Sequence, residues 1–100
     1  MEENNEVTKV IFRKYSNGEI IALFFEEPGS NRVSECLDYV HVGQHGSANV
    51  WATVKDTKLA IPEEYKDLFE ELTKNVGYNL KVCKRVSGNA LDIRYSKLNQ

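Results

Sequence analysis

Hydrophobic and polar residues alternate over the first quarter of the chain in the pattern of a β-hairpin. Two runs rich in β-branched and aromatic residues, 7–15 and 20–25, flank a polar stretch that contains Asn17-Gly18. Asn-Gly favours the positive φ angles of a type I′ turn, so we expect a two-residue loop with Tyr15 opposite Ile20. This register predicts one apolar face and one amphipathic face, and the second is typical of a surface that is partly covered or meets a partner. The apolar face holds Val10, Phe12, Ile21, Leu23 and Phe25, and the amphipathic face holds Ile11, Arg13, Tyr15, Ile20, Ala22 and Phe24.

Similar patterns predict shorter elements farther along the chain. Residues 36–42 alternate and predict a third strand, whereas 43–49 are polar, contain two glycines and predict a loop. Residues 50–54 and 90–95 predict two more short strands, and Trp51 is expected to pack against the sheet.

Apolar residues spaced three and four apart predict one helix that begins at Pro62. Proline fits the first helical position, and the acidic residues directly after it suit the positive end of the helix dipole. Gly77 can adopt the left-handed conformation that ends a helix. Residues 78–83 alternate again, which predicts a half-buried strand after the helix. The buried stripe of the helix is Tyr65, Leu68, Phe69 and Leu72.

These elements predict a single α+β domain over residues 7–100, with a flexible tail at 1–6. The expected fold is a small mixed or antiparallel sheet with one helix packed on it. The sheet contains the N-terminal β-hairpin, the third strand and the strand after the helix. A chain of 100 residues, 41% hydrophobic and 10% aromatic, is enough for one modest core.

The first residues and the length of the apolar runs indicate a cytoplasmic protein. Residues 1–6 are polar and acidic, whereas a secretory signal begins basic and continues apolar. The longest apolar run, 20–25, is far shorter than the roughly 20 residues that cross a bilayer. We therefore expect no membrane partner, and we expect Cys36 and Cys83 to stay reduced.

The net charge of −2 argues against a general nucleic-acid coat, although the basic residues are unevenly distributed. Such a basic cluster is most often a solvated strand face, and its alternative is a site for phosphate or nucleic acid. No aromatic or glycine pattern accompanies the cluster, so nucleic acid is not the favoured partner. The cluster consists of Lys81, Lys84, Arg85, Arg94 and Lys97.

Standard catalytic signatures are missing, and one unusual segment remains. The sequence has no glycine-rich phosphate loop, Cys-x-x-Cys, His-Glu-x-x-His or Gly-x-Ser-x-Gly, so we lean toward a protein that is not an enzyme and expect no cofactor or metal. The segment His41-Val42-Gly43-Gln44-His45-Gly46 holds both histidines. Along an extended strand their rings would stand about 13 Å apart unless Gly43 turns the chain.

Four roles are open for this segment. A zinc site, or an acid–base pair for phosphoester chemistry, would need the turn at Gly43. The simpler roles are a backbone-bonded histidine beside a glycine-rich turn, or a recognition loop at a strand end. The candidate binding residues of that loop are His41, Gln44, His45, Ser47 and Asn49.

Five stretches share their order and spacing with one family. They are Val10-Ile11-Phe12-Arg13-Lys14, Glu19-Ile20-Ile21-Ala22-Leu23-Phe24, Tyr39-Val40-His41-Val42-Gly43-Gln44-His45-Gly46-Ser47-Ala48, Ile61-Pro62-Glu63-Glu64-Tyr65-Lys66-Asp67-Leu68 and Gly77-Tyr78-Asn79-Leu80-Lys81-Val82. Over residues 8–86 the chain resembles a family of small uncharacterised proteins of gut Bacteroidetes, their mobile elements and their phages. The resemblance implies a context but no activity.

The chain departs from this family in two places. The family tends to have Thr before the helix-opening proline, whereas this chain has Ile61, a poor N-cap expected to lose about 1 kcal/mol. Residues 87–100 lie outside the shared pattern, so we expect them to be an extension.

The favoured hypothesis is a small non-enzymatic binding protein of a phage or mobile element. It would dock on a host macromolecule through the strand-end loop, and the expected partner is a protein, such as a component of a defence system. One alternative is a nucleotide- or phosphoester-binding domain or enzyme that uses His41 and His45. The other is a nucleic-acid binder that uses the basic cluster near the C-terminus.

Overall fold

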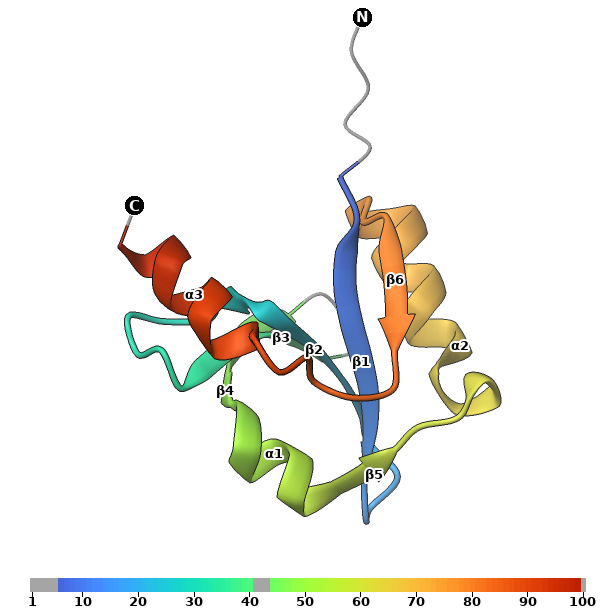
Figure 1. Ribbon diagram of the computed structural model, residues 1–100. Coiled ribbons are helices and arrows are strands. Elements are labelled where there is room, and N and C mark those ends of the chain that lie inside the picture. Colours follow the sequence, from blue (N-terminus) through green and yellow to red (C-terminus); the bar gives the residue numbers. More distant parts are fainter. Residues whose placement is uncertain (1–5, 41–43, 100) are drawn as a thin grey trace, which may run out of the picture.

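The computed structural model describes residues 6–40 and 44–99 and shows a six-stranded mixed sheet with helices against both faces (Figure 1). The α+β class is confirmed. None of the helices in these ranges is long and apolar enough to cross a membrane. The elements in chain order are β1 (Thr8–Tyr15), β2 (Ile20–Pro28), β3 (Glu35–Val40), β4 (Gln44–Asn49), α1 (Val50–Asp56), β5 (Thr57–Leu59), α2 (Pro62–Glu70), the π-helical segment η1 (Glu71–Val76), β6 (Leu80–Cys83) and α3 (Ala90–Leu98).

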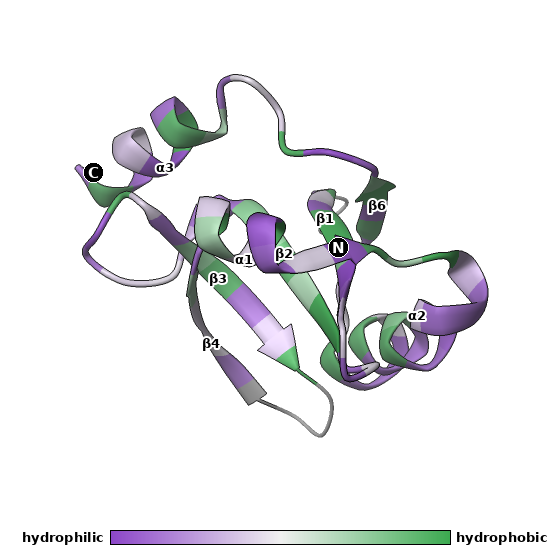
Figure 2. Ribbon diagram, turned by 90° about the horizontal axis from the view of Figure 1, so that it is seen from below, coloured by the Kyte–Doolittle hydropathy of each residue, from purple (hydrophilic) through white to green (hydrophobic). Residues whose placement is uncertain are grey.

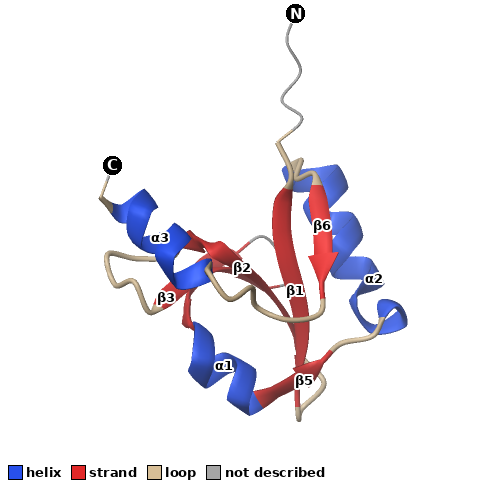
Figure 3. Cartoon of the chain, in the orientation of Figure 1, coloured by secondary structure: helices blue, strands red, loops and turns tan. Residues whose placement is uncertain are grey.

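β1 is central to the sheet because it pairs with three other strands. The order β4-β3-β2-β1-β5 is antiparallel throughout, and β6 pairs in parallel with the first half of β1. β5 and β6 lie along the same edge of β1, at opposite ends of it (Figure 3). Their C-terminal ends converge near Phe12, since β5 ends opposite Arg13 and β6 ends opposite Ile11.

The hairpin of β1 and β2 is present, but its register differs by one residue from the predicted one. Lys14, not Tyr15, lies opposite Ile20. The loop has three residues, because the Tyr15 N–H donates to the Glu19 carbonyl at 2.9 Å and Gly18 takes a positive φ of 93°. A shift of one residue exchanges the two faces of β2 relative to β1. The predicted grouping of the hairpin side chains was therefore wrong.

Both faces of the sheet are buried by the chain's own helices. α2 and η1 cover one face, which we call the α2 face, and α1 and α3 pack against the other, which we call the α3 face. Within residues 6–40 and 44–99, three α-helices are present where one was expected. The α2 face buries Val10, Phe12, Ala22, Phe24, Tyr39, Leu68 and Leu72, and the α3 face buries Ile11, Ile21, Leu23, Phe25, Cys36, Val50 and Ala90.

The segment after β3 differs most from the prediction. The predicted loop forms β4, which pairs with β3 from residue 44 onward. Residues 50–54 belong to α1, not to a strand, because the Asn49 side chain caps the helix by accepting the Ala52 N–H at 2.9 Å. Trp51 does not pack against the sheet, since 66% of its surface is exposed.

The predicted helix is present with its stop, and half of its predicted buried stripe is buried. Leu68 and Leu72 are buried, and Gly77 ends η1 with a φ of 102°. Ile61 provides no side-chain cap, as expected. The Glu64 carboxylate instead accepts the Ile61 N–H at 3.0 Å and supplies half of a capping box.

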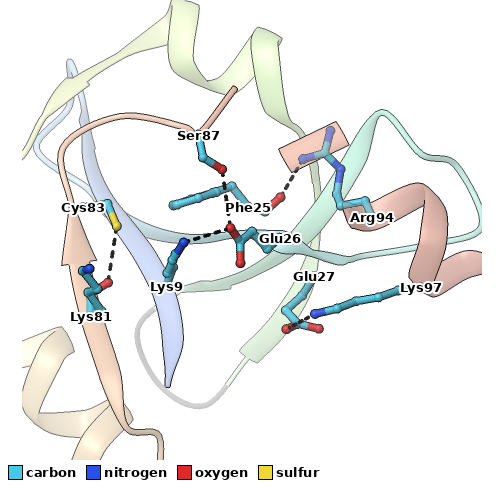
Figure 4. Close-up of polar contacts among 9 residues, drawn as sticks. All are labelled: Lys9, Phe25, Glu26, Glu27, Lys81, Cys83, Ser87, Arg94 and Lys97. Carbon is cyan, nitrogen blue, oxygen red and sulfur yellow. Dashed lines mark hydrogen bonds and ion pairs between the residues drawn. The ribbon is translucent and has the colours of Figure 1, made fainter. Parts of the chain in front are cut away.

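α3 makes the C-terminal segment part of the domain core. Residues 90–95 were predicted as a strand, but the buried residues Ala90 and Arg94 stand four apart, as they do on one helix face. Arg94 is only 2% exposed. Its guanidinium donates to the Phe25 carbonyl at 2.6 Å (Figure 4) and to the Val33 carbonyl at 2.8 Å, which fixes α3 to β2 and to the loop after it.

Candidate functional site

The described members of the predicted recognition loop have different structural roles. Gln44 begins β4, and His45 and Ser47 lie on the α2 face of that strand. Asn49 caps α1 with its side chain. His41 lies outside the described residues, so the predicted pairing of the two histidines stays a prediction.

His45 packs against aromatic side chains of the α2 face. Its ring meets Tyr39 edge-on, with ring centroids 4.8 Å apart, and its Nε2 lies 2.9 Å from the Tyr78 hydroxyl. Tyr78 in turn stacks on Phe24. Burial, and to a smaller extent the negative charge of Glu27, raise the pKa of Tyr78, so its hydroxyl stays protonated and forms a hydrogen bond with the imidazole. The Tyr78 hydroxyl therefore occupies Nε2, one of the two ring nitrogens of His45.

Gly46 leaves room for the carboxylate of Asp38, its partner in β3. A β-carbon at position 46 would lie 3.0 Å from Asp38 Oδ1. The carboxylate accepts the Gly46 N–H; burial raises the pKa of Asp38, while this bond and the charge of His45 lower it. At least this glycine of the histidine segment therefore has a packing role.

The predicted basic cluster is divided by the fold. Arg94 is buried and does not belong to a surface patch, which corrects the prediction. Lys97 pairs with Glu27 at 2.7 Å. The other members, Lys81, Lys84 and Arg85, are exposed on β6 and directly after it.

Sequence reasoning missed an apolar groove between α2 and β6. One part of it is a hollow of about 550 Å³, lined by Pro62, Glu63, Tyr65, Lys66, Phe69 and Val82. An adjoining part shares three of these residues and continues to Phe12, Leu59, Cys83 and Lys84, where the ends of β5 and β6 converge. We call the two parts together the edge groove. In Figure 2, β6 is largely hydrophobic in colour and lies near α2, which carries both hydrophobic and hydrophilic stretches.

The edge groove has a rigid floor and an open side. Phe12 stacks on Tyr65 with ring centroids 4.3 Å apart and planes within 9° of parallel, so β1 and α2 are held together beneath the groove. Val82 is 37% exposed at the rim. β6 pairs only with β1 among the described strands, so its other edge has no partner strand.

One sequence signal could have indicated this groove. The apolar stripe of α2 is wider than its buried part, because Leu68 and Leu72 face the core while Tyr65 and Phe69 are only half buried. A stripe that exceeds the buried surface leaves apolar area for a second contact. The position of that contact could not be predicted, because it depends on where β6 docks.

The two cysteines differ in exposure, and this gives a direct test of the fold. Burial raises the pKa of the Cys36 thiol to about 12, whereas Cys83 is half buried at the edge groove. Since thiolates are the reactive form, native protein at pH 8 should take up one equivalent of iodoacetamide, at Cys83, and two in denaturant. Peptide mass spectrometry would locate the label. Fast modification of Cys36 in native protein would contradict the described core.

The described residues include an open apolar groove and no cluster of metal-binding side chains. No three His, Cys, Asp or Glu side chains within the described ranges are grouped so that they could hold a metal ion. His45, the described histidine, bonds to Tyr78 and lies outside the edge groove. Comparisons with protein-family models, with curated proteins and with solved structures find no match to this chain.

Proposed function

We propose that this protein is a non-catalytic binding domain that recognises a protein partner through the edge groove. The observation that supports the proposal is an apolar groove that stays open although the chain covers both faces of its sheet. Open apolar surface beside an unpaired strand edge favours association, and a specific partner would cover it. This moves the proposed contact from the strand-end loop around His45 to the opposite edge of the sheet.

The resemblance to the Bacteroidetes family supplies the context of the proposal. In that context the partner is a host protein, such as a component of a defence system, and the domain acts by occupying a surface of it. A non-catalytic domain of this kind would act by affinity alone.

Selection from a displayed library of short random peptides tests the proposal. Wild-type protein should enrich a related set of peptides, and Val82→Asp should bind them at least about tenfold more weakly, because burial of one valine contributes roughly 1.5–3 kcal/mol. Trp51→Asp is the matched control, since it changes an exposed apolar residue on the other side of the sheet and should leave binding unchanged.

Thermal melts would show that each variant is folded. Val82→Thr keeps the shape and the strand propensity of valine and would replace Val82→Asp if the charged variant melted early. Failure of wild-type protein to enrich any peptides, or equal binding by Val82 variants and wild type, would contradict the proposal.

A further inference from the structure

Building on the proposed function, we infer that the partner presents an extended, acidic peptide segment, which pairs with β6 as an additional strand and inserts apolar side chains into the edge groove. Three observations support this ligand class: the direction of the free backbone groups of β6, the shape of the groove beside them, and the charges around it.

The backbone of β6 has hydrogen-bonding groups on the side away from β1. The Thr8 N–H donates to the Asn79 carbonyl at 2.8 Å, so odd-numbered residues of this segment turn their backbone groups toward β1. Successive residues of a strand alternate in direction, and the N–H and C=O groups of Leu80 and Val82 therefore point away from β1. An extended peptide is the ligand that satisfies such a row, because its own backbone presents complementary groups at the same spacing.

The groove beside these groups takes side chains from every second residue of an added strand. Val82 lies at the rim, and Tyr65 and Phe69 form the wall on α2. The part of the groove beside α2 has a volume of about 550 Å³, which is within the range of pockets that bind small ligands. One or two apolar side chains therefore fit there. Side chains on the opposite face of the added strand would remain in water.

The charges around the groove favour an acidic peptide. Lys66 and Lys84 line the groove, and Lys81 and Arg85 are exposed on β6 and just after it. None of these four cations forms an ion pair with a carboxylate in the described part of the chain. Glu63 is the one acidic residue of the lining. Lysines on an edge strand also discourage self-association, which leaves the edge available to a chain of opposite charge.

The test uses the peptides selected with wild-type protein, resynthesised with a fluorescent label. We expect alternating apolar residues with acidic neighbours, and binding that weakens as salt rises. Lys66→Glu and Lys84→Glu should each weaken binding about two- to fivefold, the range of a partly exposed ion pair, while Lys55→Glu on α1 is the matched control.

N-methylation of single peptide bonds separates strand addition from other modes of binding. A peptide paired with β6 donates only from every second N–H, so methylation should abolish binding at alternate positions and leave the others within about twofold. Peptides whose binding depends on Val82 but that are helical, basic or insensitive to methylation would overturn the inference. They would leave the proposed function standing. The absence of groove-dependent peptides would overturn both, and so would groove-dependent binding of a labelled oligonucleotide without peptide binding.

Discussion

Gly29→Ala should destabilise the protein by about 3 kcal/mol, or prevent it from folding, because there is no space for a methyl group at this position. A β-carbon on Gly29 would lie 2.3 Å from the Cys36 carbonyl oxygen and 2.6 Å from the β-carbon of Ser47. The first of these atoms is backbone near the start of β3, where it is held by the sheet, and it cannot move aside alone. For a domain of this size the melting temperature should fall by roughly 12–24 °C.

Gly88→Ala is the matched control for this substitution. Gly88 precedes α3, and a β-carbon there would meet nothing within 4 Å. That variant should melt close to wild type, since surface substitutions usually change stability by less than about 0.5 kcal/mol. Calorimetry that gave the same melting temperature for both alanine variants would contradict the close approach of the loop to β3.

Arg94→Ala should cost about 3–5 kcal/mol, since it removes a large buried side chain and leaves two carbonyl groups without their donor. Both carbonyls, those of Phe25 and Val33, lie under α3, and burial lowers the pKa of the guanidinium without neutralising it. Arg94→Lys should recover only part of the loss, because an ammonium group lacks the planar fork that reaches two acceptors. Urea denaturation followed by circular dichroism measures both variants.

Arg85→Ala is the control, since Arg85 is exposed and was predicted to belong to the same cluster. Loss of the Arg94 contacts should also loosen α3 over the α3 face, so Cys36 should be alkylated faster in Arg94→Ala than in wild type. If Arg94→Ala were as stable as Arg85→Ala, the contacts of the buried guanidinium would not be needed to hold α3.

Residues close together in the sequence were sufficient to predict two of the elements. The hairpin and the helix from Pro62 to Gly77 depend on neighbours within a few residues, and both are present. The register of the hairpin was mispredicted because Gly18 alone takes a positive φ, which gives a three-residue loop instead of a two-residue one. A single residue in the turn thus reversed the faces of a whole strand.

The alternation of hydrophobic and polar residues gave a wrong prediction where contacts between distant segments decide the structure. In α3 the sequence alternates over six residues, yet the segment is helical because Ala90 and Arg94 lie on one face and fit over the sheet. The same limit applies to the candidate site. Lys84 and Tyr65 were recognised separately, as a cation and a core residue, but their proximity depends on the parallel docking of β6, which no local pattern encodes.

The parallel pairing of β6 with β1 also has a consequence for folding kinetics. It joins Thr8 to Leu80, which are 80 − 8 = 72 positions apart, whereas the hairpin closes over a three-residue loop. Contacts of such long range form late, because the entropy of loop closure must be overcome first. The edge groove is therefore completed only near the end of folding, and a ligand that binds there stabilises an interaction absent from early transition states. Such a ligand slows unfolding and leaves the folding rate nearly unchanged.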